Sequence, residues 1–326
     1  MYLDIRRQLG APLSTITPRH TPTARRRGLT SRAIAVGLAM AALGLAVGAT
    51  RADAVRSDSG PTAAPAASDA CGPLVDKPGG GTWSCTFDDE FSGTTLDRDK
   101  WTVVESKVTG YHSGRECFVD SPNTVSVSDG YLHLTVYKTQ ISYCGKGLSG
   151  ITPYQSGMVT TTGHFSQAYG RFEVRAKFNS ATVRGLQESL WLFPEDPQYG
   201  AWPKSGEIDI AEAYSQYPDR VIPYVHYREK TPDPNVTNTE CYITDVSQPH
   251  TYALEWTTDS LTITYDGQVC LVDSWNPAAP LHKPQPFDQP FVMSLTQALG
   301  INTNQFNAFT TPLPATTDVD YVRIWQ

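Results

Sequence analysis

The sequence predicts an all-β protein, a sandwich of two antiparallel sheets. Polar and apolar residues alternate strictly over 171–178, which places one face of a strand against a core and the other face in water. Turn-forming residues recur about every 8 to 12 positions, a spacing typical of sandwiches. No long amphipathic helical pattern interrupts them. The part of the chain over 71–326 is long enough to bury one large core.

Several strands can be placed individually. Leu132, Leu134 and Val136 repeat the alternation. The segment 261–265 runs into Asp266 and Gly267, a hairpin turn signal, and continues as a second strand over 269–272. A closing strand is expected over 321–325.

The N-terminus has the pattern of a secretory signal peptide over residues 1–54. Arg25–Arg27 and Arg32 form a charged head, the run 33–50 is uncharged and mostly apolar, and Ala52-Asp53-Ala54 supplies a cleavage signal. We therefore expect a secreted, extracellular protein, with the general and the twin-arginine export routes both open. The alternative is a membrane anchor, because eighteen apolar residues can span a bilayer.

Residues 55–70 are rich in Ser, Pro, Ala and Asp, which indicates a flexible linker, and 71–326 is then the folded domain. Residues 1–54 carry eight Arg and two Asp, so their removal takes the formal net charge from −7 to −13. Such an acidic chain is a poor partner for nucleic acid or for an anionic membrane. We expect neither partner after cleavage, and we expect a monomer.

The six cysteines all lie in the exported part, at positions 71, 85, 117, 144, 241 and 270. An even number in an exported chain indicates disulfides. Spacing suggests the pairs Cys71–Cys85, Cys117–Cys144 and Cys241–Cys270, among fifteen possible pairings. Zinc is the alternative, but the sequence has no Cys-x-x-Cys pair to support it.

Three carboxylates stand close together in Ser-Gly-Glu-Ile-Asp-Ile-Ala-Glu, residues 205–212. In a regular strand Glu207 and Asp209 share a face, whereas Glu212 points the other way. A one-residue bulge just before Glu212 would set all three on one face. Carboxylates packed in this way raise each other's pKa, which suits a general acid working near neutral pH. The alternative is a solvated run of acids with no chemistry.

Residues 202–212, Trp-Pro-Lys-Ser-Gly-Glu-Ile-Asp-Ile-Ala-Glu, resemble the signature of glycoside hydrolase family 16 in its bulged, laminarinase-like form. The resemblance implies a β-jelly-roll, concanavalin-like sandwich with a concave substrate cleft. It also implies hydrolysis of β-linked glucans or galactans with retention of configuration. Further blocks follow in the same order as in laminarinase-like members: Asp89–Gly93, Leu96 with Lys100–Trp101, Val125–Gly130, Tyr169–Glu173 and Val319–Arg323.

The resemblance assigns Glu207 as nucleophile and Glu212 as general acid and base, with Asp209 between them as an electrostatic partner. Retaining glycosidases need two carboxyl groups about 5–5.5 Å apart, which a bulged strand can supply. This chemistry needs no cofactor. The expected enzyme is an endo-β-1,3-glucanase acting on a polysaccharide.

The resemblance also implies substrate-binding residues. Trp202 matches the aromatic floor at the point of cleavage and Trp191 a second wall, since sugar C–H faces stack on such rings. Either tryptophan can instead be a core residue, and a lone strand histidine is often structural. The remaining candidates are His226, Asn123, Arg175, Glu116 and Gln297.

Two segments depart from the laminarinase pattern, and both are expected to line the cleft. The chain reads Leu-Gln-Glu-Ser-Leu-Trp over 186–191 and Thr-Gln-Ala-Leu-Gly-Ile over 296–301. An aromatic platform is lost and Gln187, Glu188 and Gln297 are gained. Another β-glucan or a galactan therefore remains an alternative substrate, transglycosylation an alternative reaction, and carbohydrate binding without catalysis a third class.

Members of this family often carry a structural calcium away from the cleft. Asp320 matches the C-terminal ligand, and Gly130 and Glu90 match the N-terminal ones. Oxygen ligands from separated segments suit Ca²⁺. The alternative is that Asp320 binds a loop and Glu90 is solvated.

Overall fold

The computed structural model describes residues 68–145 and 150–326, and strands dominate these residues. The strands are β1 (Ser68–Asp69), β2 (Gly72–Pro73), β3 (Cys85–Asp89), β4 (Thr102–Val103), β5 (Cys117–Phe118), β6 (Val125–Ser128), β7 (Tyr131–Tyr143), β8 (Ile151–Ser156), β9 (Met158–Thr160), β10 (Gly170–Lys177), β11 (Leu186–Pro194), β12 (Glu207–Tyr214), β13 (Val221–His226), β14 (His250–Trp256), β15 (Leu261–Tyr265), β16 (Gln268–Asp273), β17 (Phe291–Leu299) and β18 (Ala315–Trp325). The short helices are α1 (Ser106–Thr109), η3 (Pro234–Val236) and η4 (Asn302–Asn304).

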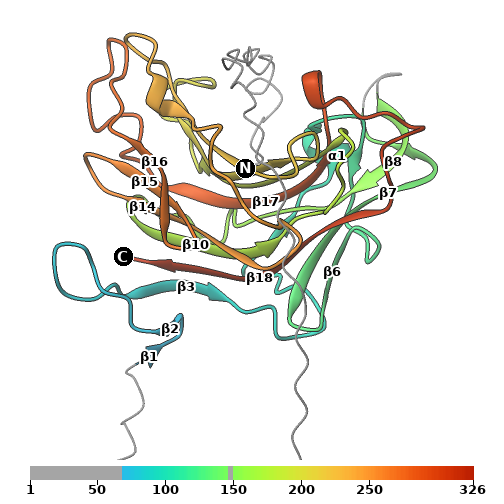
Figure 1. The fold of residues 1–326 in the computed structure, drawn as a ribbon, viewed down its shortest axis with the longest axis horizontal. Helices are drawn as coiled ribbons and strands as arrows, with labels where there is room; N and C mark the ends of the chain where they lie inside the picture. The colour runs from blue at the N-terminus through green and yellow to red at the C-terminus, as the bar shows by residue number, and fades with distance from the viewer. Residues whose placement is uncertain (1–67, 146–149) are drawn as a thin grey trace, which may run out of the picture. The chain divides into compact units, whose positions relative to one another are not determined.

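Two large sheets form the sandwich that the sequence predicts. The six-stranded sheet has the order β13-β12-β11-β17-β9-β4. The ten-stranded sheet has the order β16-β15-β14-β10-β18-β7-β8-β5, with β3 beside β18 and β6 beside β7. In Figure 1, β17 of the first sheet lies above β10 and β18 of the second. Pairing within both sheets is antiparallel except between β5 and β8.

The core lies between the two sheets. On β10, Phe172 and Val174 are buried in it, so the alternating polar residues of that strand point to the outer face of the ten-stranded sheet. On β12, Ile208 and Ile210 enter the same core. Before the bulge, the alternating side chains Glu207 and Asp209 therefore point away from the core. We call that outer side of the six-stranded sheet the acid-bearing face.

The predicted hairpin is confirmed, because β15 and β16 pair through the turn at Asp266 and Gly267. The three suggested disulfides are also confirmed: Cys71–Cys85, Cys117–Cys144 and Cys241–Cys270.

The folded part begins slightly earlier than predicted. Ser68 and Asp69 fall within the expected linker, yet they pair with Gly72 and Pro73, and the Asp69 side chain accepts the backbone N–H groups of Cys71 and Cys85. The predicted signal peptide over 1–54 and the rest of the linker lie outside the described residues. Among the residues described, no helix has the length and apolarity needed to cross a membrane.

Candidate active site

The bulge predicted in β12 is present. On β13, Tyr224 lies opposite Asp209 and Ile222 lies opposite Glu212. Two residue steps along β13 therefore face three steps along β12, which is one extra residue on β12. On β11, Trp191 and Ser189 occupy the positions opposite Asp209 and Glu212. Since Trp191 and Ser189 are two apart, they share a face. The bulge therefore brings Glu212 onto the acid-bearing face with Asp209.

A tyrosine from the opposite sheet holds the bulge. The register shift leaves Ile210 without a partner on β13, and the hydroxyl of Tyr265 on β15 donates to the Ile210 carbonyl at 2.9 Å. Both residues are buried. A buried carbonyl needs such a donor, so this contact across the core stabilises the bulged arrangement.

Glu207 stands at the start of β12 and is almost fully buried. The indole Nε1–H of Trp202 donates to Glu207 Oε2 at 2.5 Å. Burial, with the charge of Asp209 as the next cause, raises the pKa of Glu207 to about 8, and the Trp202 hydrogen bond opposes that rise. Because an indole can only donate, this contact favours the ionised carboxylate.

Asp209 lies between a carboxylate and a histidine. Its Oδ2 is 3.0 Å from Nε2 of His226 on β13, and its side chain also hydrogen-bonds that of Glu207. Burial and then the charge of Glu212 raise the pKa of Asp209, while burial lowers the pKa of His226. Burial therefore favours the neutral form of both side chains, the unprotonated ring of His226 and the protonated carboxyl of Asp209.

Glu212 has three neutral side chains around it. Gln187 Nε2 donates to Oε1 at 2.9 Å, the Ser189 hydroxyl lies 3.3 Å from the same oxygen, and the Tyr214 hydroxyl donates to Oε2 at 2.7 Å. Burial raises the pKa of Glu212. The sequence analysis did not select Ser189 or Tyr214. Tyr214 follows Glu212 by two positions, so strand periodicity alone placed it on the same face.

Both predicted tryptophans lie on the acid-bearing face. Trp202 is partly buried, with its ring centroid 5.4 Å from that of His226. Trp191 is 5% exposed, and its Nε1–H donates to Thr296. It packs against Phe193 in a second apolar cluster that lines this face. Trp202 is therefore the more accessible ring beside the acids.

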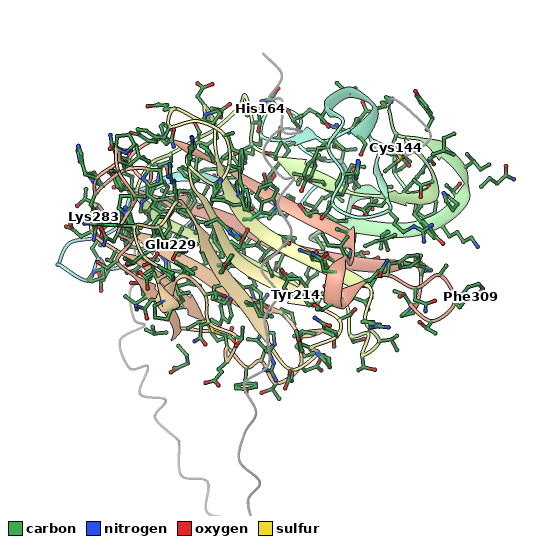
Figure 2. All side chains as sticks on the ribbon, turned by 90° about the horizontal axis from the view of Figure 1, so that it is seen from above. Cys144, His164, Tyr214, Glu229, Lys283 and Phe309 are labelled. Carbon is green, nitrogen blue, oxygen red and sulfur yellow. A yellow bond between two sulfur atoms is a disulfide. The ribbon has the colours of Figure 1, made fainter. Side chains whose placement is uncertain are left out.

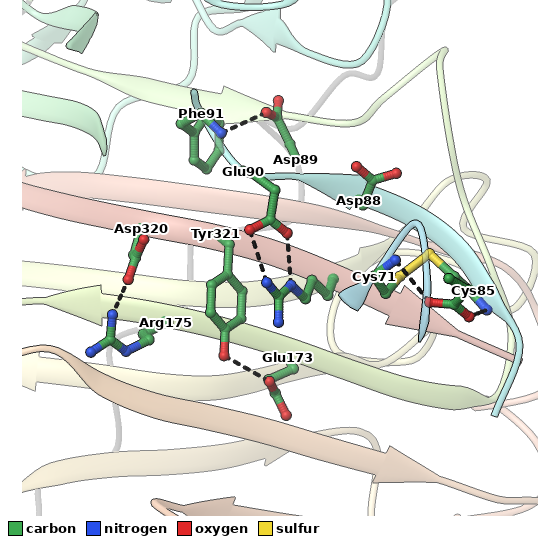
Figure 3. Close-up of polar contacts among 12 residues, drawn as sticks. Cys71, Cys85, Asp88, Asp89, Glu90, Phe91, Glu173, Arg175, Asp320 and Tyr321 are labelled. Carbon is green, nitrogen blue, oxygen red and sulfur yellow. Dashed lines mark hydrogen bonds and ion pairs between the residues drawn. A yellow bond between two sulfur atoms is a disulfide. The ribbon is translucent and has the colours of Figure 1, made fainter. Parts of the chain in front are cut away.

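Two predicted binding residues do not reach this face. Gln297 on β17 points into the space between the sheets, where Thr317 of β18 donates to its Oε1. Its neighbour Glu188 also points inward, and burial raises the pKa of Glu188 to about 8. Arg175 lies on the outer face of the other sheet and forms an ion pair with Asp320 (Figure 3). Both segments that depart from the laminarinase pattern were expected to line the cleft. Of Gln187, Glu188 and Gln297, only Gln187 lies on the acid-bearing face.

Glu116 and Asn123 lie in loops. The Glu116 carboxylate is buried and accepts backbone N–H groups, from Gly114 at 2.9 Å and from Leu299 at 3.1 Å, which indicates a role in fixing the loop. Asn123 is exposed in a turn before β6, and the contacts described for it are within that turn.

The residues predicted for calcium do not form a cation site in this arrangement. Both oxygens of Glu90 accept from the guanidinium of Arg323, at 2.7 and 2.9 Å, and Asp320 is paired with Arg175 (Figure 3). Gly130 lies in the exposed turn between β6 and β7. A cation bound by Glu90 would have to displace Arg323, and one bound by Asp320 Oδ2 would have to displace Arg175. In contrast, one possible ligand atom each of Glu207, Asp209 and His226 lie within 4.8 Å of one another, a grouping on β12 and β13 that could hold a metal ion.

Comparison with known proteins gives consistent matches. Residues 115–304 match the family described as "Glycosyl hydrolases family 16". The chain is 31% identical over 264 residues to a glucan endo-1,3-beta-glucosidase A1 of Niallia circulans, covering 74% of this chain but 37% of that protein. It is 28% identical to a glucan endo-1,3-beta-glucosidase of Cryptopygus antarcticus, covering 68% and 82% of the two chains. The X-ray structure of the laminarinase from Rhodothermus marinus superposes with a TM-score of 0.62 at 27% identity, covering 75% and 97%.

Proposed function

The chain belongs to the glycosyl hydrolases of family 16, and from that membership we propose that it is a secreted, retaining endo-β-1,3-glucanase. The observation that carries the proposal is the bulged strand β12. It presents three acids on one face, and each acid has different hydrogen-bonding partners. A carbohydrate-binding protein without catalysis has no need of this costly arrangement of buried carboxylates.

In the proposed reaction the carboxylate of Glu207 attacks the anomeric carbon while Glu212 gives its proton to the glycosidic oxygen. The C–O bond breaks, the shortened chain leaves as an alcohol, and a glycosyl ester forms on Glu207. Glu212, now ionised, takes a proton from water, and the resulting hydroxide equivalent attacks the same carbon and releases Glu207. Two inversions give overall retention.

The surroundings of the two glutamates support these different roles. Trp202 offers Glu207 only a donor, which favours the ionised nucleophile. The hydroxyls beside Glu212 can accept as well as donate, and Gln187 Oε1 is buried without a hydrogen-bond partner among the described residues. A half turn of that amide would let Gln187 accept the proton of a neutral Glu212. Asp209 hydrogen-bonds Glu207, which adds to the difference between the surroundings of the two glutamates.

The substrate proposal rests on the two relatives named above, both glucan endo-1,3-beta-glucosidases. A neutral glucan also fits the acid-bearing face, where Trp202 and the ring of His226 offer stacking surfaces. Transglycosylation uses the same residues and differs in the acceptor. Assays with and without an added acceptor oligosaccharide separate the two reactions.

The test compares the parent with Glu207→Gln on laminarin, mixed-linkage β-glucan, galactans and agarose. We expect the parent to act best on laminarin, and the variant to keep its melting temperature but lose activity by several orders of magnitude. Substantial activity in a folded Glu207→Gln would sink the assignment of the nucleophile. Preference for a galactan would replace the β-1,3-glucan proposal.

Export is part of the proposal and has its own test. N-terminal sequencing of the protein recovered from culture medium should find a chain that begins at Val55, directly after the predicted cleavage signal. A chain that stays in the membrane fraction and retains residues 33–50 would support an anchor instead.

A further inference from the structure

A cavity of about 330 Å³ opens at the end of β11 and β17, and we propose that it binds an anionic substituent on the polysaccharide. The inference deepens the proposed function and rests on it for the identity of the polysaccharide. The lining residues that matter are Arg115, Arg184, Asn302, Gln305, Asn307 and Phe309.

The first argument is uncompensated positive charge. Arg115 and Arg184 are both exposed, and neither forms an ion pair with any residue in the described ranges, whereas Arg98, for example, pairs with Asp120. Among the residues that the structure describes, none of those lining the cavity is acidic. Glu116, next in sequence to Arg115, is buried with both oxygens directed at backbone N–H groups. In a chain of net charge −7, this local cationic site is an exception that favours an anion.

The second argument is that both arginines rise from fixed backbone. The carbonyl of Arg184 accepts the Thr311 hydroxyl at 2.9 Å, and the carbonyl of Arg115 accepts the Thr152 hydroxyl. The floor of the cavity is Phe306, which is buried in an apolar cluster. The backbone from which the two arginine side chains extend is therefore held in place, so binding a ligand would order the side chains but not the backbone.

The third argument is position. Gln187, which donates to Glu212, lies three residues after Arg184, so their backbones can be at most about 10 Å apart, the span of three fully extended residues. Asn304 ties the same region to the end of β12, since its Oδ1 accepts from the backbone N–H groups of Gly185 and Gln216. The cavity thus lies beyond the Glu212 end of the catalytic strand, within reach of a group attached to a chain that covers the acids.

The chemistry of the lining specifies the ligand class. Guanidinium groups bind carboxylate and sulfate through paired hydrogen bonds, and the neighbouring amides of Asn302 and Gln305 can complete the contacts of such a group. Phe309 is 97% exposed. Figure 2 shows it at the edge of the molecule. An aromatic ring in that position can stack on the sugar that carries the anion. Carboxylate and sulfate substituents share this chemistry.

The experiment measures KM and kcat on three β-1,3-glucans: laminarin, carboxymethylated glucan and sulfated laminarin. Arg115→Gln combined with Arg184→Gln should raise KM on one or both charged substrates about tenfold, as expected for the loss of two charge-assisted contacts, and leave laminarin unchanged. Arg98→Gln is the matched control, because it removes one exposed charge elsewhere and should change nothing. Salt should raise KM of the parent on the charged glucan but not that of the double variant.

Three outcomes overturn the inference: equal changes on neutral and charged glucans, no change on either charged glucan, or the same effect from Arg98→Gln. The two charged substrates decide between carboxylate and sulfate. If the parent hydrolyses no glucan, the proposed function fails, and the cavity is then tested by titrating the charged glucans into parent and double variant. Tighter binding by the parent supports the site in that case, and equal binding overturns it.

Discussion

The contact between Tyr265 and the carbonyl of Ile210 allows a sharp test of how the bulge is maintained. Tyr265→Phe removes the hydroxyl and leaves a buried carbonyl without a donor, at a cost of about 1–3 kcal/mol. For a domain of this size each kcal/mol lowers the melting temperature by about 2–4 °C, so a fall of about 2–12 °C is expected. Because Glu212 depends on the bulge for its direction, kcat should fall as well.

Tyr252 provides the matched control. It packs edge-to-face on Tyr265 with ring centroids 5.0 Å apart, and its buried hydroxyl has no hydrogen-bond partner within residues 68–145 and 150–326. Tyr252→Phe should therefore be neutral or slightly stabilising and leave kcat intact. Thermal melting and laminarin assays on both variants decide the matter. Equal losses of stability would show that the hydroxyl of Tyr265 does not carry the effect and would refute the reasoning.

Three further predictions follow from the charges of the molecule. Trp202→Phe removes the indole donor that opposes the rise in the pKa of Glu207. The acidic limb of the profile of kcat/KM against pH should therefore move to higher pH, and kcat/KM at pH 6 should fall about tenfold or more. An unchanged acidic limb would contradict this. Burial raises the pKa of Glu188 from 4.5 to about 8, so the folded protein keeps a proton that the unfolded chain has already lost. The free energy of unfolding should therefore fall as pH rises from about 4.5 to 8. The urea midpoint of Glu188→Gln, relative to that of the parent, should rise between pH 5 and pH 9. A difference in midpoint that stays constant over this range would count against the prediction. Because Asp320 is already paired with Arg175, chelator and excess calcium should give the same melting temperature; a calcium-dependent rise that Asp320→Ala abolishes would restore the calcium site.

Much of the fold was predictable because its determinants are local. The alternation over 171–178 predicts β10, and the turn at Asp266 and Gly267 predicts the β15–β16 hairpin. The bulge was predictable from one conflict of parity between Asp209 and Glu212. Spacing along the chain was also enough to suggest the three disulfides.

The partners of a strand are not local, and here the sequence was insufficient. Arg175 faces outward on a strand that belongs to the sheet opposite the acids, and only the pairing of β10 with β14 and β18 establishes that. Gln297 faces inward for a similar reason, since its parity on β17 is fixed by Leu295 in the core. Tyr265 comes from the sheet opposite to Ile210, so no sequence pattern near the motif indicates their contact.

The roles of the two glutamates are tested together by azide rescue. Glu207→Gly and Glu212→Gly are each given an activated β-glucoside and azide, and the azide product is examined by NMR. Without its nucleophile the enzyme should yield the α-glycosyl azide, because azide attacks once with inversion. Without its acid and base it should yield the β-glycosyl azide, because azide then opens the ester on Glu207 in a second inversion. The reverse pattern, or the β-azide from both variants, would contradict Glu207 as the nucleophile.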